Sequence, residues 1–409
     1  MLFRHQKFCI WRNMKDDTNI VRGLDEEAFH KLDAHLNKSI NSHRLPIYQT
    51  STYLFDSVEE AYNAFMGTEH HHIYSRVSNP NAIYVGAKVA ILEDAEAGIA
   101  LNSGMSAITT ALLTLLRPGD KLIASKPIYG GTSELLDFLR EFGISVKFSD
   151  ADSIYEDLER EYYNVCLIET PANPTLDIFD ISLISNICKE KETFLIVDNT
   201  FATPYHQKPI KLGADAVIHS STKYLSGHGD NIGGVIVGKE DFIKKVLHTM
   251  KLFGTIAQPF SAWLTARGIR TLAVRMRKHS ENGMRIAQYL ESKEEVLKVY
   301  YPGLPSFKYY PIAVKQMENG FSGMVSFVLD GNVEHLKKFI SNLSLFHFAV
   351  SLGDTDSLIT APALTTHALS PIKDFPETLI RLSVGIEDAE DLIEDLENAF
   401  RKTFHGIRI

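Results

Sequence analysis

Three groups of polar residues in the middle of this chain could act together on one small molecule. Lys223 stands in a Ser/Thr-rich run with Ser220 and Thr222, and Asp198 stands upstream of that run. The turn Ser103-Gly104-Met105 precedes an apolar stretch. On its own, a lysine in such a run is usually solvated, and an aspartate or a Ser-Gly turn is usually a helix cap. No single group therefore decides the function.

Together, these groups are the partners that an aldehyde-bearing phosphate cofactor needs. A lysine amine can form an imine with the aldehyde, and an aspartate can keep a ring nitrogen protonated. The first turn of a helix presents backbone N–H groups to a phosphate, and nearby hydroxyls can add to them. Pyridoxal 5'-phosphate (PLP) requires such a set. We therefore predict a PLP site with Lys223 as the imine lysine and Tyr129 as a ring-stacking residue and acid.

The predicted secondary structure places these groups at the ends of strands. Short apolar β-rich runs alternate with helical ones, with strands predicted at 121–124, 144–148, 165–168, 194–197, 216–218 and 235–237 and helices at 132–142 and 181–191. This alternation indicates an α/β protein with a mostly parallel sheet that is covered on both faces. In such sheets, ligands bind outside the carboxyl ends of the strands. Asp198 and the run that ends at Lys223 each follow a strand, so both would face the ligand.

Three regions are expected along the 409 residues. Residues 1–70 are mixed and polar, which favours an N-terminal arm that contacts a neighbouring subunit. Residues 71–265 would form the PLP-binding large domain, and residues 266–409 a smaller C-terminal α/β domain. The main elements predicted in the second domain are a long basic helix over 267–291, a strand at 325–328 and a helix over 387–400.

Composition excludes several classes of protein. The chain has 42 basic and 51 acidic residues and a net charge of −9, which argues against a nucleic-acid partner. No apolar run reaches the roughly 20 residues that cross a bilayer, and residues 1–15 lack the apolar core of a secretory signal. The three cysteines are far apart in sequence, which argues against a disulfide framework. We predict a cytoplasmic protein with no membrane partner.

His70, His71 and His72 suggest a metal site as an alternative. Adjacent histidines cannot easily all reach one ion, and no cysteine or carboxylate spacing supports a site. We predict that the protein binds no metal and that this cluster is a surface segment near the arm.

Several motifs resemble the Cys/Met-metabolism family of PLP enzymes, which includes cystathionine γ-synthase, cystathionine γ-lyase, methionine γ-lyase and O-acetylhomoserine sulfhydrylase. The resemblance runs from about residue 40 to the end of the chain, and its motifs are collinear. The matching stretches are Tyr74-Ser75-Arg76-Val77-Ser78-Asn79-Pro80, Ser103-Gly104-Met105-Ser106, Tyr129-Gly130-Gly131-Thr132, Glu169-Thr170-Pro171-Ala172-Asn173-Pro174, Val197-Asp198-Asn199-Thr200, Ser220-Ser221-Thr222-Lys223, Ser351-Leu352-Gly353-Asp354 and Arg381-Leu382-Ser383-Val384-Gly385.

This resemblance implies the fold type I architecture of PLP-dependent transferases, which is that of aspartate aminotransferase. It also implies a cofactor-binding role for each matched position. Lys223 would carry the cofactor, Asp198 would bind the ring nitrogen, Tyr129 would stack on the ring, and Asn173 would lie near the phenolic oxygen. The residues implied for the phosphate are Ser103, Gly104, Met105, Ser220 and Thr222 of the same chain, with Tyr74 and Arg76 from a neighbouring subunit.

The resemblance also implies how substrate and subunits are arranged. Arg381 and Ser351 would bind the carboxylate of a small amino-acid substrate, with Asn173 and Val350 beside it. The active site would be complete only in a dimer, and dimers would pair into a homotetramer.

The implied reaction is cleavage of a carbon–sulfur bond at the γ-carbon of methionine or cystathionine, which releases a thiol, 2-oxobutanoate and ammonia. Lys223 would remove the Cα proton, and Tyr129 would protonate the departing sulfur. An alternative is γ-replacement, as in cystathionine γ-synthase or O-acyl-homoserine sulfhydrylase, because both reactions use the same residues. A PLP-binding protein without turnover is a more distant alternative.

Two positions that vary within the family point to different substrates. Gly131 stands where methionine γ-lyases carry a cysteine, as it does in cystathionine γ-lyases and sulfhydrylases. Val350 stands where cystathionine γ-lyases carry a glutamate, as in methionine γ-lyases. Loss of that glutamate should weaken recognition of the far amino group of cystathionine. We therefore expect a preference for a short apolar γ-substituent such as a methylthio group.

Overall fold

Two β-sheets organise the protein in the computed structural model, which describes residues 15–22, 42–68, 71–365 and 375–406. The first sheet has seven strands in the order β1-β7-β6-β5-β4-β2-β3. Its strands are β1 (Ala97–Leu101), β2 (Lys121–Ser125), β3 (Ser145–Ser149), β4 (Val165–Glu169), β5 (Phe194–Asp198), β6 (Ala216–His219) and β7 (Gly234–Gly238). The strands from β6 to β3 run parallel, and β7 is antiparallel to both β1 and β6. The predicted α/β class with a mostly parallel sheet is confirmed.

The central strands are apolar because both faces of the sheet are covered. All five residues of β4 and the apolar residues at 195–197 in β5 are buried. Helices contact strands across the width of this sheet. α4 (Pro80–Glu93) and α5 (Gly104–Leu115) pack against β7, α8 (Ile181–Glu190) against β5, and α6 (Gly130–Arg140) against β3. Continuous burial on both faces leaves polar side chains only where the strands end. Those ends therefore carry the candidate site.

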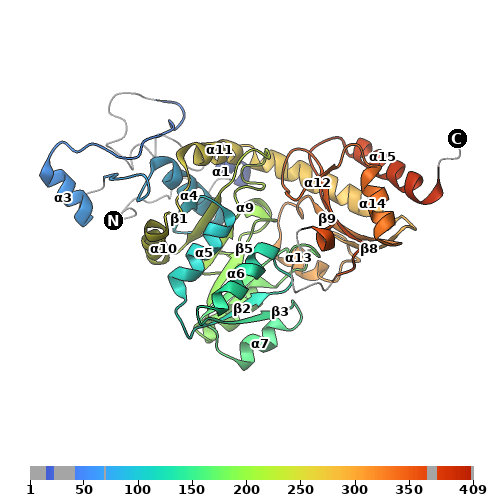
Figure 1. Ribbon diagram of the computed structural model, residues 1–409, viewed down its shortest axis with the longest axis horizontal. Coiled ribbons are helices and arrows are strands. Elements are labelled where there is room, and N and C mark those ends of the chain that lie inside the picture. Colours follow the sequence, from blue (N-terminus) through green and yellow to red (C-terminus); the bar gives the residue numbers. More distant parts are fainter. Residues whose placement is uncertain (1–14, 23–41, 69–70, 366–374, 407–409) are drawn as a thin grey trace.

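Of the helices that flank the first sheet, two were predicted, at 132–142 and 181–191, and they agree with α6 and α8 to within about two residues. The full set is α1 (Asp16–Arg22), α3 (Val58–Met66), α4 (Pro80–Glu93), α5 (Gly104–Leu115), α6 (Gly130–Arg140), α7 (Ile154–Arg160), α8 (Ile181–Glu190), α9 (Thr203–His206), α10 (Glu240–Phe253) and α11 (Pro259–Ile269). Figure 1 shows α3 standing apart from the rest of the molecule, on the side opposite the second sheet.

The second sheet has five strands in the order β10-β11-β12-β9-β8. These are β8 (Val296–Tyr300), β9 (Met324–Leu329), β10 (His347–Phe348), β11 (Leu358–Thr360) and β12 (Leu379–Ser383). The helices with it are α12 (Leu272–Glu291), α13 (Tyr310–Gln316), α14 (Val333–Ser341) and α15 (Ala389–Phe400), followed by the short turns η2 (Pro362–Leu364) and η3 (Arg401–His405). The exact domain limits proposed above stay a prediction.

One predicted helix, over 267–291, is in fact two. α11 ends at Ile269 and α12 begins at Leu272, because Thr271 has a non-helical ψ of 5°. Gly268 packs so closely on the Ser226 carbonyl that an added Cβ would lie 2.1 Å from its oxygen. The buried Arg275 donates from Nη2 to the Gly268 carbonyl at 2.8 Å, which satisfies an acceptor near the break. Periodicity does not reveal such a tertiary contact.

The histidine cluster also differs from the prediction. His72 is buried, and its Nδ1 lies 2.9 Å from the Ser78 hydroxyl. His71 faces Glu60 at 3.4 Å, and His70 lies outside the described residues. Within the part of the chain that the structure describes, no group of His, Cys, Asp or Glu could hold a metal ion. His71 and His72 therefore serve local packing rather than forming an exposed segment.

None of the described helices is both long enough and apolar enough to cross a membrane.

Candidate active site

Lys223 lies just beyond the carboxyl end of β6, as the sequence predicts. Its Nζ donates a hydrogen bond to the Ser351 hydroxyl at 3.1 Å, which links the first sheet to the loop before β11. Burial and, to a smaller extent, the nearby positive charge of Arg381 lower the pKa of Lys223 to about 8. A lysine with this pKa has a neutral fraction of about a tenth at pH 7, far more than an exposed lysine, so it can act as a nucleophile or a base.

Arg381 projects from β12 and joins the predicted substrate-binding residues. Its Nη1 donates to Asn173 Oδ1 at 2.8 Å, and its Nη2 donates to the Ser351 carbonyl at 3.2 Å. The residue is only 2% exposed, and burial lowers its pKa to about 10, so it still carries its charge at neutral pH. Its Nε has no hydrogen-bond partner among the described residues. A buried guanidinium with a free donor can bind a carboxylate.

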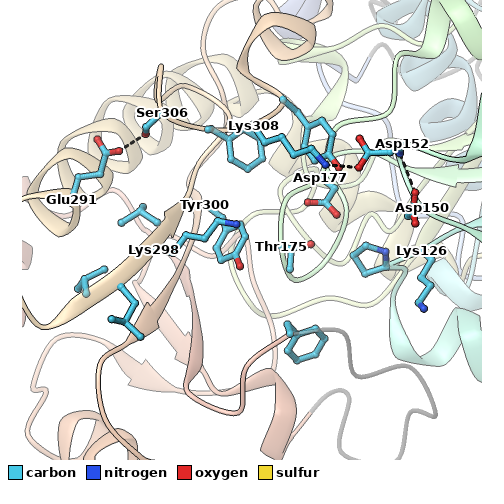
Figure 2. A pocket seen from close by; sticks show the side chains of 17 residues that line it. Lys126, Asp150, Asp152, Thr175, Asp177, Glu291, Lys298, Tyr300, Ser306 and Lys308 are labelled. Atoms are coloured by element: carbon cyan, nitrogen blue, oxygen red, sulfur yellow. Dashed lines mark hydrogen bonds and ion pairs between the residues drawn. The ribbon is translucent and has the colours of Figure 1, made fainter.

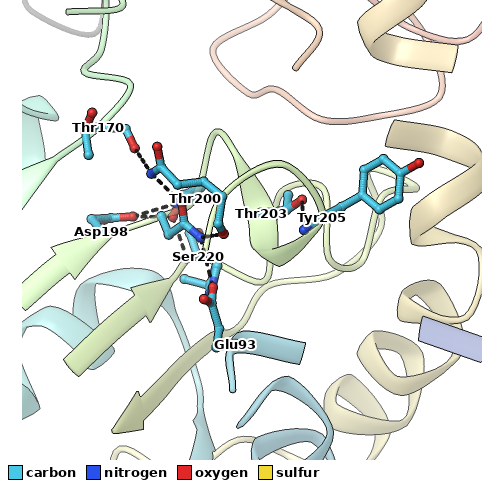
Figure 3. A network of polar contacts seen from close by, with 10 residues as sticks. Glu93, Thr170, Asp198, Thr200, Thr203, Tyr205 and Ser220 are labelled. Atoms are coloured by element: carbon cyan, nitrogen blue, oxygen red, sulfur yellow. Dashed lines mark hydrogen bonds and ion pairs between the residues drawn. The ribbon is translucent and has the colours of Figure 1, made fainter. Parts of the chain in front are cut away.

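Asp198 ends β5, and its carboxylate is oriented by Thr200. The Thr200 backbone N–H and hydroxyl both donate to Asp198 Oδ1, at 3.0 and 2.5 Å (Figure 3). The same hydroxyl accepts a hydrogen bond from the Ser220 N–H at 2.8 Å. Burial raises the pKa of Asp198, while the Thr200 bonds and the positive charge available on His219 oppose that rise. One oxygen of Asp198 is thus fixed, and the other can accept from a protonated ring nitrogen.

Thr200 is a site residue that the sequence reasoning did not single out. It stands two residues after Asp198, which is the spacing at which an aspartate side chain bonds its own backbone in a turn. That spacing was the available signal. Its link to Ser220 could not be read from the sequence, because it depends on the pairing of β5 with β6.

The start of α5 forms the candidate phosphate cradle. Ser103 is the N-cap, and its side chain and that of Ser106 cap each other's backbone N–H groups. The remaining N–H groups of the first turn, those of Gly104 and Met105, have no intrahelical acceptor. A Cβ on Gly104 would lie 2.7 Å from Ser220 Cβ, so only glycine lets the Ser220 segment approach this turn.

Thr222 is placed differently from the other phosphate candidates. Its hydroxyl donates to the Gly233 carbonyl at 3.2 Å and accepts from the Gly233 N–H at 3.0 Å. A hydroxyl has one donor, so binding a phosphate would require this hydrogen atom to turn away from Gly233. The role of Thr222 toward a phosphate stays a prediction.

Tyr129 lies at the N-terminal end of α6, and 43% of its surface is exposed. Its ring passes directly over Gly131, where an added Cβ would lie 2.8 Å from Tyr129 Cε1 and 3.4 Å from Met105 Sδ. Tyr129 and the start of α5 therefore flank one space. A side chain at position 131 would push the ring away from its present position.

Glu169 is a second site residue without an assigned role in the sequence reasoning. It ends β4, is 5% exposed, and accepts from the Tyr129 N–H at 3.1 Å and the Asn173 N–H at 2.8 Å. Burial and the adjacent Asp198 raise the pKa of Glu169 to about 8, although both of these hydrogen bonds oppose the rise. It lies within a motif used for the resemblance, which was the only signal for it.

Val350 and the two residues expected from a neighbouring subunit lie at the surface. Val350 directly precedes Ser351 and is 61% exposed. Tyr74 and Arg76 are exposed as well, and Arg76 Nη1 donates to the Lys251 carbonyl at the end of α10. Arg76 also packs on the Tyr74 ring, 5.6 Å from its centroid. No contact of these two residues with Lys223 or Ser220 occurs among the described residues, so within one chain the structure does not bring them to the site.

A cavity of about 670 Å³ lies between the two sheets, beside this site (Figure 2). It is lined by residues that follow β2, β3 and β4 and by residues of β8, among them Lys126, Asp152, Asp177 and Tyr300. None of the 17 residues around it is a predicted site residue.

The residues at the strand ends fit PLP by the chemistry of the groups present. An amine with a lowered pKa, a fixed carboxylate and a glycine-lined helix start lie at the carboxyl end of the first sheet. The buried guanidinium of Arg381, on β12 of the second sheet, is joined to that amine through Ser351, and its Nε has no partner among the described residues. These groups match the aldehyde, ring nitrogen and phosphate of the cofactor and the carboxylate of an amino acid.

Several known proteins are similar to this chain over most of its length. The chain is 42% identical to an L-methionine gamma-lyase of Fusobacterium nucleatum subsp. nucleatum, over 93% of this chain and 98% of that protein. It is also 42% identical to a cystathionine beta-lyase of Lactococcus lactis subsp. cremoris, over 90% of this chain and 96% of that protein. A crystal structure of cystathionine gamma synthase from Xanthomonas oryzae pv. oryzae superposes with a TM-score of 0.89 at 32% identity, over 96% of this chain and all of that one.

The model of one protein family, described as Cys/Met metabolism PLP-dependent enzymes, matches residues 28–401. That match spans both sheets and every predicted site residue. It confirms the predicted family, the fold type I architecture and the cofactor. This chain is a member of the Cys/Met metabolism family of PLP-dependent enzymes.

Proposed function

We propose that this enzyme cleaves the Cγ–S bond of methionine and, with consumption of one water molecule, releases methanethiol, 2-oxobutanoate and ammonia. One observation carries the proposal. The hydroxyl of Ser351 binds Lys223 Nζ, while its carbonyl binds Arg381. A substrate whose carboxylate is held by Arg381 would therefore have its Cα close to the lysine amine.

The residues that we propose to hold PLP are those that the family resemblance implies, and the site geometry supports most of them. Lys223 would hold it covalently through Nζ, Asp198 would bind its ring nitrogen, and Tyr129 would cover one face of its ring. The phosphate would bind at the start of α5, with Ser103, Gly104, Met105, Ser220 and Thr222. When bound, the cofactor supplies an electron sink for the charge that develops at the substrate Cα.

The chain's own groups would move the protons. Lys223 Nζ takes the Cα proton, which its lowered pKa permits. Once it has given up that proton, Lys223 Nζ takes a second proton, from Cβ. The Cγ–S bond then breaks, and the electron pair departs with the sulfur. The Tyr129 hydroxyl donates a proton to that sulfur, so the product leaves as a thiol. Arg381 holds the carboxylate throughout, assisted by Asn173, whose Oδ1 orients the guanidinium.

The side chain at position 350 favours methionine over cystathionine as the substrate. An exposed apolar side chain beside Ser351 offers no partner to a distal ammonium group, and it can contact a methyl group instead. A hydrophobic contact of this size discriminates substrates only modestly, by about 10–200-fold.

γ-Replacement is a second candidate function, because Gly131 matches the sulfhydrylases and its lack of a side chain lets the Tyr129 ring pack directly on it. The relative named cystathionine beta-lyase adds a third outcome that an assay can separate, cleavage at Cβ.

A homo-oligomer is part of the proposal. Tyr74 and Arg76 would reach the phosphate of a second subunit, since within one chain they lie exposed near α10. Dimers that share active sites would pair into tetramers. The cytoplasmic location stays a prediction from composition.

The test is an assay of keto-acid products from methionine, cystathionine and O-acetylhomoserine, with and without an added thiol. We expect 2-oxobutanoate from methionine at a higher kcat/KM than from cystathionine. Pyruvate from cystathionine would show β-cleavage, and a thioether product formed only with added thiol would show replacement. A strong preference for cystathionine would contradict the proposal.

A further inference from the structure

Glu169 joins two loops that carry different site residues. Its Oε2 accepts from the Tyr129 N–H, in the connection from β2 to α6, and its Oε1 accepts from the Asn173 N–H, in the connection from β4 to α8. The Glu169 N–H in turn donates to the Ser125 hydroxyl at 2.9 Å, at the end of β2. One side chain thus sets the separation between the loop of Tyr129 and the loop of Asn173.

The position of Glu169 is costly for a carboxyl group. It is 5% exposed, and it pairs in register with Asp198 across the parallel strands β4 and β5, so both carboxyl groups project from the same face. Two adjacent buried carboxyl groups disfavour each other's ionised form. A purely structural position at this strand end would be filled more favourably by a neutral side chain.

A carboxyl group is nevertheless the group that this place requires. Two backbone N–H donors converge on it, and each needs its own acceptor. Each of the two oxygens of a carboxyl group keeps an acceptor lone pair whether the group is ionised or protonated, whereas glutamine of the same size has one acceptor oxygen and a nitrogen that only donates. With glutamine, one of the two N–H groups would face an NH₂ group.

The consequences of this contact extend to the substrate. Asn173 is fixed through its backbone by Glu169, and its Oδ1 accepts from Arg381 Nη1 at 2.8 Å. Arg381 also contacts Ser351, which binds Lys223. A continuous series of hydrogen bonds therefore runs from the Tyr129 backbone to the lysine.

We propose that Glu169 is a positioning residue that holds Tyr129, the proposed acid, and Asn173, which orients Arg381, at a fixed separation. The kinetic consequences of this inference rest on the proposed function, whereas the hydrogen bonds of Glu169 do not depend on it. Among the described residues, the hydrogen bonds of Glu169 go to Tyr129, Asn173 and Ser125, so the covalent attachment of the cofactor should not depend on it.

The first measurement is hydrogen–deuterium exchange of the holoenzyme, resolved to single amides by mass spectrometry. The wild-type protein should protect the amides of Tyr129 and Asn173, although both lie in loops. In Glu169→Gln, at least one of these amides should exchange about tenfold faster, the factor expected when one buried hydrogen bond is lost. Rapid exchange of both amides in the wild-type protein would overturn the proposal, even if the variant does not fold.

The second measurement separates a positioning role from a structural one. With methionine, Glu169→Gln should raise KM through Arg381 and lower kcat through Tyr129, with a combined loss in kcat/KM of about 100-fold, as expected for a misplacement of about 1 Å. Cofactor content and melting temperature should stay near the wild-type values. Wild-type kinetic constants in a folded variant would overturn the proposal.

Asp177→Asn is the matched control. Asp177 is another carboxyl group in the connection from β4 to α8, and burial raises its pKa to about 6. It lines the neighbouring cavity instead of contacting Tyr129 (Figure 2). Its substitution should leave the kinetic constants and the exchange of both amides unchanged. If the wild-type enzyme does not act on methionine, the exchange result still decides the role of Glu169, and only the substrate claim fails.

Discussion

At the scale of single residues, the charge environment of Lys223 is the property most closely tied to catalysis. Burial and the positive charge of Arg381 both disfavour the protonated amine, and they lower its pKa to about 8. The Nζ of Lys223 donates a hydrogen bond to the Ser351 hydroxyl. In cofactor-free protein, Lys223 therefore gains its reactive neutral form as the pH rises through about 8, well below the range of an exposed lysine.

This pKa predicts how cofactor-free protein should recover the cofactor. The rate of reconstitution with added PLP should rise with pH and level off above about 8. In Arg381→Met, a repelling positive charge is gone, so the pKa of Lys223 rises and the midpoint of the curve moves to higher pH. The measurement is the growth of visible absorbance at a series of pH values.

Arg285→Met serves as the control for that series. Arg285 is half-exposed and pairs with Glu390 on α15, far along the chain from the site residues. Its substitution should leave the midpoint unchanged. Titration of the cofactor itself affects all of the proteins equally, so the comparison with this control removes its contribution. An identical midpoint in Arg381→Met and the wild-type protein would show that Arg381 does not influence the lysine.

The sequence indicated most of the candidate site residues, but not the residues that hold them in position. Lys223, Ser351, Arg381 and Asn173 belong to motifs, and the structure joins them by hydrogen bonds. Thr200 and Glu169 escaped notice because their role is to bond backbone N–H groups of other loops. Which amides meet a given side chain depends on strand pairing and loop course, and no residue pattern encodes that directly.

At the scale of elements, a buried polar network fixes the strands that carry the site. Glu93, the last residue of α4, accepts from His219 at the end of β6 at 2.6 Å and from Asn199 after β5 at 2.9 Å. Glu93 and His219 are both fully buried. Asn199 and Gln207 extend the network to the Thr170 carbonyl (Figure 3). The network holds the ends of β5 and β6 against α4.

Removing Glu93 should therefore destabilise the fold rather than the chemistry alone. Glu93→Ala removes the carboxylate partner of a buried imidazole and one of the two acceptors of the buried Asn199 amide, a change that costs about 3–5 kcal/mol in comparable buried pairs. Denaturant unfolding followed by circular dichroism measures the loss. Glu156→Ala is the control, since Glu156 pairs with Arg160 on the surface of α7. Equal losses in the two variants would refute a structural role for this network.

The elements themselves were largely predictable, because strand and helix periods follow from burial. The strands β2 to β7 agree with their predicted runs to within about one residue, and the break between α11 and α12 was the main error. Next to that break, Gly268 lies close to the Ser226 carbonyl, and Arg275 donates to the Gly268 carbonyl. A contact between distant segments leaves no mark on local periodicity.

At the scale of the whole molecule, the proposed sharing of sites between subunits makes a specific prediction. Arg76→Ala and Lys223→Ala should each remove nearly all activity. A mixed dimer of the two variants would contain one intact site, because one subunit supplies Lys223 and the other supplies Arg76. Random mixing by co-refolding should restore about a quarter of the wild-type activity.

The control for mixing uses two residues of one chain's own site. Lys223→Ala mixed with Asp198→Ala should restore no activity, because every site in the mixed dimer lacks one of the two residues. If Arg76→Ala with Lys223→Ala also restores none, the proposed contribution of Arg76 to a neighbouring subunit is wrong. In that case, the position of α3 away from the rest of its own chain (Figure 1) would need an explanation other than contact with a neighbouring subunit.

The central claim is that Lys223 is the residue that holds the cofactor, and one measurement tests it directly. The purified yellow enzyme is reduced with borohydride and digested, and the pyridoxyl-labelled peptide is located by mass spectrometry. We predict the label on Lys223 alone, and Lys223→Ala should carry none. A label on another lysine, or a colourless protein that borohydride does not modify, would contradict this account.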